Sequence, residues 1–224
     1  MKRISELKNA ALASLKGQWE NAVLTFLVYY VIVGGGNILL YISGWFLDGN
    51  ADGDTLTGQL LVDVYSLLAV PLAWGLNCYY LRIMRRGDKV NVGNIFSGYS
   101  QFGRIFLTLL LKAVYIFLWS LLLFVPGIVK SLSYAMTEFV LADNPELKYN
   151  GAIERSMKLM RGHKWQFFVL CLSFIGWILL CILTFGIGFL WLGPYFQTTM
   201  AAFYEDLLAE EAAEISPEPV ADAL

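Results

Sequence analysis

The chain has 224 residues, of which 58% are hydrophobic and 15% are charged, and its mean hydropathy is +0.59. A soluble domain has about 45–50% apolar and about 25% charged residues, so one core of this size cannot hide the surplus apolar surface, and that surface must face lipid. The net charge of −2 argues against nucleic acid as a partner, because phosphate binding requires a basic surface.

We expect an all-α membrane protein in which about six transmembrane helices form three hairpins within residues 1–204. A membrane helix needs about 20 mainly apolar residues. The candidate spans are about 21–47, 60–81, 104–125, 127–142, 165–183 and 187–204. The first contains Gly34-Gly35-Gly36, which predicts a bend or a point of close packing, and the fourth is the shortest.

The basic residues predict that both termini are cytoplasmic. If all six segments cross, residues 1–20, 82–103, 143–164 and 205–224 lie inside. Thirteen of the sixteen Lys and Arg residues then lie inside, Arg104 lies at the border, and the outer loops have none. This is the asymmetry expected of cytoplasmic loops. Five crossings would place the acidic tail outside. The excess of Lys and Arg in cytoplasmic loops does not exclude this, because acidic residues have little influence on it, but six crossings agree better with the positions of the basic residues.

Neither a metal site nor a cofactor is predicted. The three cysteines lie in apolar runs without a CxxC pair, and the chain has one histidine. The outer loop 48–59 contains Asp48, Asp52 and Asp54, but it lacks the glutamate that closes a calcium-binding EF-hand loop. We interpret this loop as a solvated turn.

Two cytoplasmic segments, 4–15 and 150–161, have apolar residues at helical spacing with basic residues beside them. Such helices lie in the headgroup layer or pack beneath a bundle, and both can hold at once. The densest cluster comprises Arg155, Lys158, Arg161 and Lys164. We expect these four cations to contact anionic phospholipid headgroups.

A weak repeat runs through the chain. The segments LKGQW (15–19), FSGYSQF (96–102) and MRGHKW (160–165) each lead into the first helix of a hairpin. We therefore expect three copies of a basic interfacial helix, a glycine and a helical hairpin. Repeats of this kind build many transporters, but duplication of a stable hairpin explains them equally well.

The chain resembles a bacterial membrane-protein family known as domain of unknown function 975. The residues that carry the resemblance are FSGY (96–99), VPGIVKSLSY (125–134), LADNP (141–145), MRGHKW (160–165), SFIGW (173–177), and Gly186-Ile187-Gly188 leading to Pro194-Tyr195. The resemblance implies a multi-pass protein of the bacterial cytoplasmic membrane and brings no catalytic residues. More distantly, the chain is similar to the membrane domains fused to some glycerophosphodiester phosphodiesterases, without their catalytic barrel.

Four ionisable residues lie inside the expected spans: Asp63, Lys112, Lys130 and Glu138. Such residues are costly in a membrane and suggest function by default. We expect Lys112 to pair with Glu138 near the inner side, while Lys130 and Asp63 both lie near the outer side, where they can form a second pair. Either these residues form a proton or substrate relay, or Lys112 pairs with Glu138 for packing while Lys130 and Asp63 extend to water.

Two further expectations concern boundaries. Tryptophan is enriched at both membrane interfaces, so we expect Trp19 and Trp165 at the inner boundary and Trp45 and Trp191 at the outer one. The tail 205–224 has seven acidic residues and no basic ones, which predicts disorder. The tail either contacts a cytoplasmic partner or solvates the end of the chain.

No catalytic motif such as GxSxG, HExxH or a P-loop is present, and we expect no enzyme activity. Two function classes remain. The first is a non-enzymatic membrane protein with a structural, assembly or regulatory role. The second is a small transporter or channel that uses the intramembrane charges. A polar path to Lys112, Glu138 or Asp63 would favour the second class.

Overall fold

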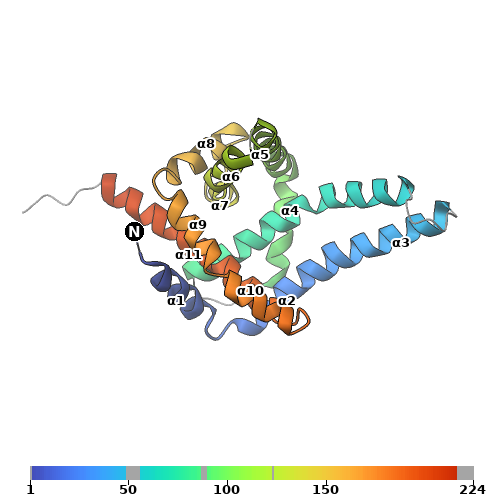
Figure 1. The fold of residues 1–224 in the computed structure, drawn as a ribbon, viewed down its shortest axis with the longest axis horizontal. Helices are drawn as coiled ribbons and strands as arrows, with labels where there is room; N and C mark the ends of the chain where they lie inside the picture. Colours follow the sequence, from blue (N-terminus) through green and yellow to red (C-terminus); the bar gives the residue numbers. More distant parts are fainter. Residues whose placement is uncertain (1, 49–55, 87–89, 123, 216–224) are drawn as a thin grey trace, which may run out of the picture.

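The computed structural model describes residues 2–48, 56–86, 90–122 and 124–215, and within them the regular structure is entirely helical (Figure 1). The order of the helices is the one that the sequence repeat predicts. Each copy has a short helix, a first arm and a return arm. The outer loop with Asp52 and Asp54, and the side chain of Asp48, lie outside the described residues, so the solvated turn stays a prediction.

The three copies have the following helices. The first copy has the short helix α1 (Ile4–Leu15), a first arm of α2 (Trp19–Tyr30), η1 (Val31–Gly35) and α3 (Gly36–Asp48), and the return arm α4 (Leu56–Arg86). The second has η2 (Val92–Gln101), the arm α5 (Phe102–Leu122) and a return arm of α6 (Phe124–Ser133) and α7 (Thr137–Asp143). The third has α8 (Asn150–Leu159), an arm of α9 (Lys164–Leu172) and α10 (Ile175–Leu183), and the return arm α11 (Phe189–Ile215).

Glycine makes the turn between the short helix and the first arm in two copies. Gly17 has φ +82° and Gly162 has φ +90°, a left-handed conformation that ends a helix at little cost only for glycine. In the second copy η2, which is a 3-10 helix, continues directly into α5. There Gly98 has another role, because a side chain at this position would collide with the carbonyl of Pro71 in α4.

The predicted irregularity at Gly34-Gly35-Gly36 is confirmed. The helix widens to a π-helical turn, η1, at this point. A side chain at Gly36 would collide with the ring of Tyr65, whose hydroxyl donates a hydrogen bond to the Ile32 carbonyl at 2.5 Å. The glycine therefore allows the first arm and α4 to pack closely while a carbonyl of the widened turn is satisfied.

Four helical segments are long and apolar enough to cross a membrane: Trp19–Gly44, Thr57–Arg85, Val92–Leu121 and Lys164–Leu183. They indicate a multi-pass membrane protein. The other two expected spans are not among them, so the structure supports fewer candidate spans than the six expected. Residues 134–136 interrupt the expected span 127–142, and the expected span 187–204 lies in α11, whose later turns are polar.

The short helices close the three copies into a ring. Each packs against the return arm of the preceding copy: η2 against α4, α8 against α7, and α1 against α11. Polar contacts fix two of these pairs. Tyr99 of η2 donates to the Leu68 carbonyl at 3.1 Å, and the backbone amide of Lys2 donates to Asp206 Oδ2 at 2.8 Å. The expected amphipathic segments 4–15 and 150–161 thus pack against other helices of the molecule, and their expected position in the headgroup layer stays a prediction.

The return arm of the third copy corrects one expectation. Residues 205–215 continue α11 as a helix instead of forming the start of a disordered tail. Asp206 and Leu207 are buried because α1 covers this part of α11. Residues 216–224 lie outside the described residues, and their predicted disorder stays a prediction.

Candidate functional site

Arg85 joins the three return arms α4, α7 and α11. Its two terminal nitrogens donate to the two carboxylate oxygens of Asp143 at 2.6 Å each, and its Nε donates to Glu205 Oε1 at 2.6 Å. Tyr204 donates to Asp143 Oδ2 at 2.9 Å. Only arginine offers a planar fork that can bind one carboxylate with two nitrogens and still reach a second carboxylate. We call these four residues the charged centre.

A second polar group surrounds Glu138 on α7. Lys112 Nζ of α5 lies 3.1 Å from Glu138 Oε1, so the structure places the expected pair in contact, with the side chains 16% and 23% exposed. Asn77 of α4 donates to Glu138 Oε2, and Trp74 Nε1 donates to the Glu138 carbonyl at 3.0 Å. The carboxylate therefore connects the first and second copies as well as the two arms of one hairpin.

Two of these bonds join the return arms of successive copies. Asn77 of α4 contacts Glu138 of α7, and Asp143 of α7 contacts Tyr204 of α11. The polar residues therefore meet where the return arms converge. The sequence repeat alone could not show this, because it does not say which arms are neighbours.

Asp63 and Lys130 are not brought together as expected. Asp63 accepts a hydrogen bond from Gln59, one turn earlier on α4, at 2.9 Å. Lys130 of α6 lies over the ring of Trp119, with Nζ 4.6 Å from the ring centre. The two residues belong to different hairpins, and each finds its partner within its own hairpin.

The basic segment 155–164 meets the first part of the acidic tail. Arg155 of α8 makes a two-pronged ion pair with Glu211 of α11. The hydrogen bonds with Glu211 raise the pKa of Arg155 above its ordinary value. His163 Nε2 lies 3.8 Å from Glu210 Oε1. The part of the expected disordered tail that contains Glu210 and Glu211 is therefore in contact with this segment, while Lys158 and Arg161 are exposed.

Arg104 supports α7 from the side of α5. Its guanidinium donates to the carbonyls of Leu141, Asn144 and Leu147 at 3.1 Å each, at and just after the end of α7. The last carbonyls of a helix lack partners inside the helix and carry partial negative charge. Arg104 satisfies them and so fixes the segment that contributes Asp143 to the charged centre.

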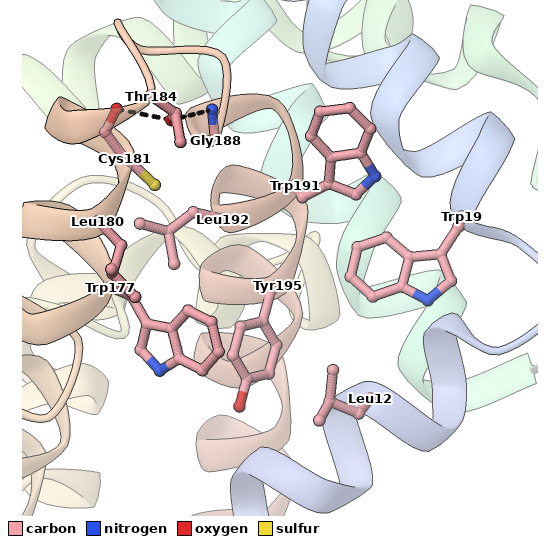
Figure 2. A pocket seen from close by; sticks show the side chains of 10 residues that line it. All are labelled: Leu12, Trp19, Trp177, Leu180, Cys181, Thr184, Gly188, Trp191, Leu192 and Tyr195. Atoms are coloured by element: carbon pink, nitrogen blue, oxygen red, sulfur yellow. Dashed lines mark hydrogen bonds between the residues drawn. The ribbon is translucent and has the colours of Figure 1, made fainter.

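Figure 2 shows an apolar cavity of about 350 Å³ between α1 and α2 on one side and α10 and α11 on the other. Trp19, Trp177 and Trp191 line it, with Tyr195 beside Trp177 and Leu12 below Trp19 in this view. Thr184 contributes little polarity, because its hydroxyl donates to the Cys181 carbonyl at 2.9 Å and accepts from the Gly188 amide at 3.1 Å. The lining of the cavity therefore suits a hydrocarbon chain.

The same cavity corrects the expected tryptophan positions. Trp19 and Trp191 were expected at opposite boundaries of the membrane, yet both line this one cavity. The reason is that α1 runs along α11, which carries the start of α2 toward the beginning of α11. Trp165 is exposed, and the side chain of Trp45 lies outside the described residues.

Three more cavities are lined by described residues. One of about 310 Å³ lies between α2, α10 and α11, one of about 330 Å³ lies beside Trp19, and one of about 200 Å³ lies between α8 and α11. Lys112 and Glu138 line none of these four cavities. Among the described residues no cluster of His, Cys, Asp and Glu could hold a metal ion, and the three cysteines are unpaired thiols.

The helical fold and the exposed apolar hairpins define a multi-pass membrane protein. The chain belongs to the family described as protein of unknown function (DUF975), which matches residues 1–133 and 121–211. Neither a curated protein nor a solved structure matches it. The distant resemblance to phosphodiesterase membrane domains thus has no support from these comparisons.

Sequence analysis missed the charged centre. Arg85 and Glu205 were counted only as cytoplasmic charges, although Asp143 lies in the LADNP segment that carries the family resemblance. The one signal in the sequence was Asp143 itself, a carboxylate within the family motif LADNP for which sequence analysis offered no role. Its partners could not be identified from the sequence, because they lie on other return arms.

Proposed function

We propose that the chain is a non-enzymatic protein of the bacterial cytoplasmic membrane, with a structural, assembly or regulatory role. The observation that carries the proposal is the charged centre. Arg85 binds both Asp143 and Glu205 and so joins three helices. Charges paired in this way hold helices together, which supports a structural role.

Both termini lie on the cytoplasmic side in this proposal. Lys2 contacts Asp206, so the start of the chain and the later part of α11 lie on the same side of the molecule. The thirteen basic residues of the expected inside segments favour that side as cytoplasmic. This orientation does not depend on whether each hairpin crosses the membrane completely or turns back inside it. In both cases the hairpin begins and ends on the same side, so the same segments lie in the cytoplasm.

Anionic phospholipid is the partner we propose for the surface of α8 and the following turn. Lys158 and Arg161 are exposed, and Lys164 is partly exposed. Each cation next to an anionic leaflet contributes about 1 kcal/mol. Arg155 contributes less than its position in the sequence suggests, since Glu211 neutralises it.

A transporter is the alternative, and the pair formed by Lys112 and Glu138 is the observation in its favour, because paired intramembrane charges also occur in proton relays. A flux measurement separates the two classes. The purified protein is reconstituted in liposomes that contain a pH-sensitive dye, and a potassium diffusion potential drives protons inward. We expect the wild type to be no more permeable to protons than liposomes without protein.

The matched variant is Glu138→Gln, which keeps the shape of the side chain and removes its charge. A proton flux in the wild type that this variant abolishes would overturn the proposal in favour of a transporter. Equal, background permeability of both proteins supports a non-transport role.

A further inference from the structure

The hairpin formed by α10 and α11 ends in an apolar turn. Phe185 is 98% exposed, Leu183 is 76% exposed and Ile187 is 62% exposed. The sequence from Trp165 to Tyr204 contains no charged residue. A turn that reached the water on the far side of a membrane would be expected to be polar, as the loop 48–59 of the first hairpin is.

The turn also satisfies its own backbone donors. Each backbone amide from Thr184 to Leu192 donates a hydrogen bond within the hairpin, and the amide of Gly188 uses the Thr184 hydroxyl at 3.1 Å. Water would satisfy these groups without such an arrangement. In hydrocarbon every unpaired backbone donor costs several kcal/mol, so complete internal pairing suits a turn surrounded by acyl chains.

The position of α1 limits how far this hairpin projects. Lys8 Nζ donates to the Ser173 carbonyl at 3.1 Å and lies 4.2 Å from the centre of the Phe174 ring. In the same helix Ser5, Glu6 and Asn9 are exposed. These polar groups must stay in water or among headgroups. The hydrocarbon therefore begins at the level of Ser173 or closer to the tip of the hairpin.

The remaining length is too short for a crossing. Twelve residues separate Ser173 from Phe185, and at 1.5 Å per residue they extend about 18 Å. The hydrocarbon core is about 30 Å thick, and any tilt of the helix reduces the depth further. The full segment Lys164–Leu183 has the 20 residues that a crossing needs, but its first half, α9, contacts the start of the chain, because Gln166 donates to the Lys2 carbonyl at 2.8 Å.

We propose that the hairpin of α10 and α11 enters the membrane from the cytoplasmic side and turns back within the hydrocarbon, so that its tip at Phe185 is surrounded by acyl chains. This inference rests on the proposed membrane role and cytoplasmic termini. It replaces the fifth and sixth expected crossings by a re-entrant hairpin.

The second hairpin resembles the third in its short return arm, whereas the first hairpin is longer. In the second, α6 has ten residues, about 15 Å, before the break at residues 134–136, and the Ser133 carbonyl accepts a hydrogen bond from Ser156 of the polar helix α8 at 3.0 Å. In the first, α4 has 31 residues, about 46 Å, and Figure 1 shows α3 and the first half of α4 projecting beyond the other helices. Only the first hairpin has both the length and the polar loop for a complete crossing.

Depth measurement with nitroxide spin labels tests the proposal. Single cysteines replace Leu172, Leu179 or Phe185 in the full chain, with Cys171 replaced by alanine because it is the partly exposed native thiol. The labelled proteins are reconstituted in liposomes of phosphatidylethanolamine and phosphatidylglycerol. The accessibility of each label to oxygen, which concentrates in hydrocarbon, is compared with its accessibility to a water-soluble nickel complex.

We expect the depth to increase steadily from Leu172 through Leu179 to Phe185. A complete crossing would instead make Leu179 the deepest position and Phe185 shallow, and that result would overturn the re-entrant hairpin. If no label prefers oxygen, the proposed membrane role itself fails, which is a different outcome. Leu183→Cys gives a second tip position if the Phe185 variant does not fold, and Asp52→Cys in the first hairpin should be accessible to the nickel complex.

Discussion

Glu138 is the residue at which two copies of the repeat depend on each other most directly. Its carboxylate accepts from Lys112 in its own hairpin and from Asn77 in the first copy. A carboxylate in this position needs its partners, because a charge without one is costly when water is scarce. Removing one member should therefore be worse than removing the pair.

A double-mutant cycle measures this dependence. We expect Lys112→Met and Glu138→Leu each to lower thermal stability in detergent, and the double variant to lose less than the sum of the two. Coupling of about 1–3 kcal/mol is typical of groups in one ion-pair network. Additive losses would show that the two charges do not stabilise each other.

The contact between Lys112 and Glu138 was predicted from the sequence, whereas the partners of Asp63 and Lys130 were not. Lys112 and Glu138 were matched because both were expected near the inner ends of the two helices of one hairpin. Asp63 and Lys130 were matched by depth alone, across hairpins, and they have different partners. Depth in a membrane restricts one coordinate, whereas a contact requires that the two helices also be neighbours.

At the scale of helices, the closest packing is between α4 and η2. A side chain at Gly75 would collide with the backbone carbonyl of Ile95, which has no freedom to move aside as a flexible side chain would. Ile95 is itself fully buried at this contact. The position therefore requires glycine even though glycine weakens a helix.

We predict that Gly75→Ala lowers the stability of the protein by about 1–3 kcal/mol, the usual cost of overpacking a tight contact. The matched control is Gly103→Ala in α5, where a side chain would meet nothing within 4 Å. The control should be neutral or stabilise by up to about 1 kcal/mol, because alanine favours a helix over glycine. Thermal unfolding followed by circular dichroism distinguishes the two, and equal effects would refute the contact.

The surface of α8 gives a second prediction at this scale. We expect the triple variant Lys158→Gln, Arg161→Gln, Lys164→Gln to retain less anionic phospholipid in native mass spectrometry than the wild type. The control Arg155→Gln should retain nearly as much as the wild type, since Glu211 already neutralises Arg155. If the triple variant and the wild type retain equal lipid, these cations serve topology alone.

The existence of most helices followed from apolar runs, but their divisions did not. The expected span 127–142 is broken at residues 134–136, where the Tyr134 amide donates to Lys130 and Ser131, and the Thr137 hydroxyl donates to the Tyr134 carbonyl at 2.8 Å. The Thr137 amide donates to the same carbonyl, and the amides of Tyr134 and Ala135 also bond to carbonyls three residues earlier, so the chain tightens here and the helix is interrupted within an apolar run. Hydropathy does not register such a local change.

At the scale of the whole molecule, the three copies form a ring in which each short helix is held by the preceding return arm. The repeat could be predicted from the sequence, but the ring could not. A sequence repeat shows which segments are alike, and it does not show which of them are in contact. The contact between α1 and α11 closes the ring and brings the start of the chain to the end of the last return arm. The charged centre then lies where the three return arms converge.

We propose that all three hairpins enter the membrane from the cytoplasmic side, where the short helices α1, η2 and α8 lie. Labelling of single cysteines with a membrane-impermeant maleimide tests it most directly. In intact cells we predict labelling of Asp52→Cys and none of Asn91→Cys or Asn150→Cys, and in inside-out vesicles the reverse. Labelling of Asn91→Cys or Asn150→Cys in intact cells would contradict the account.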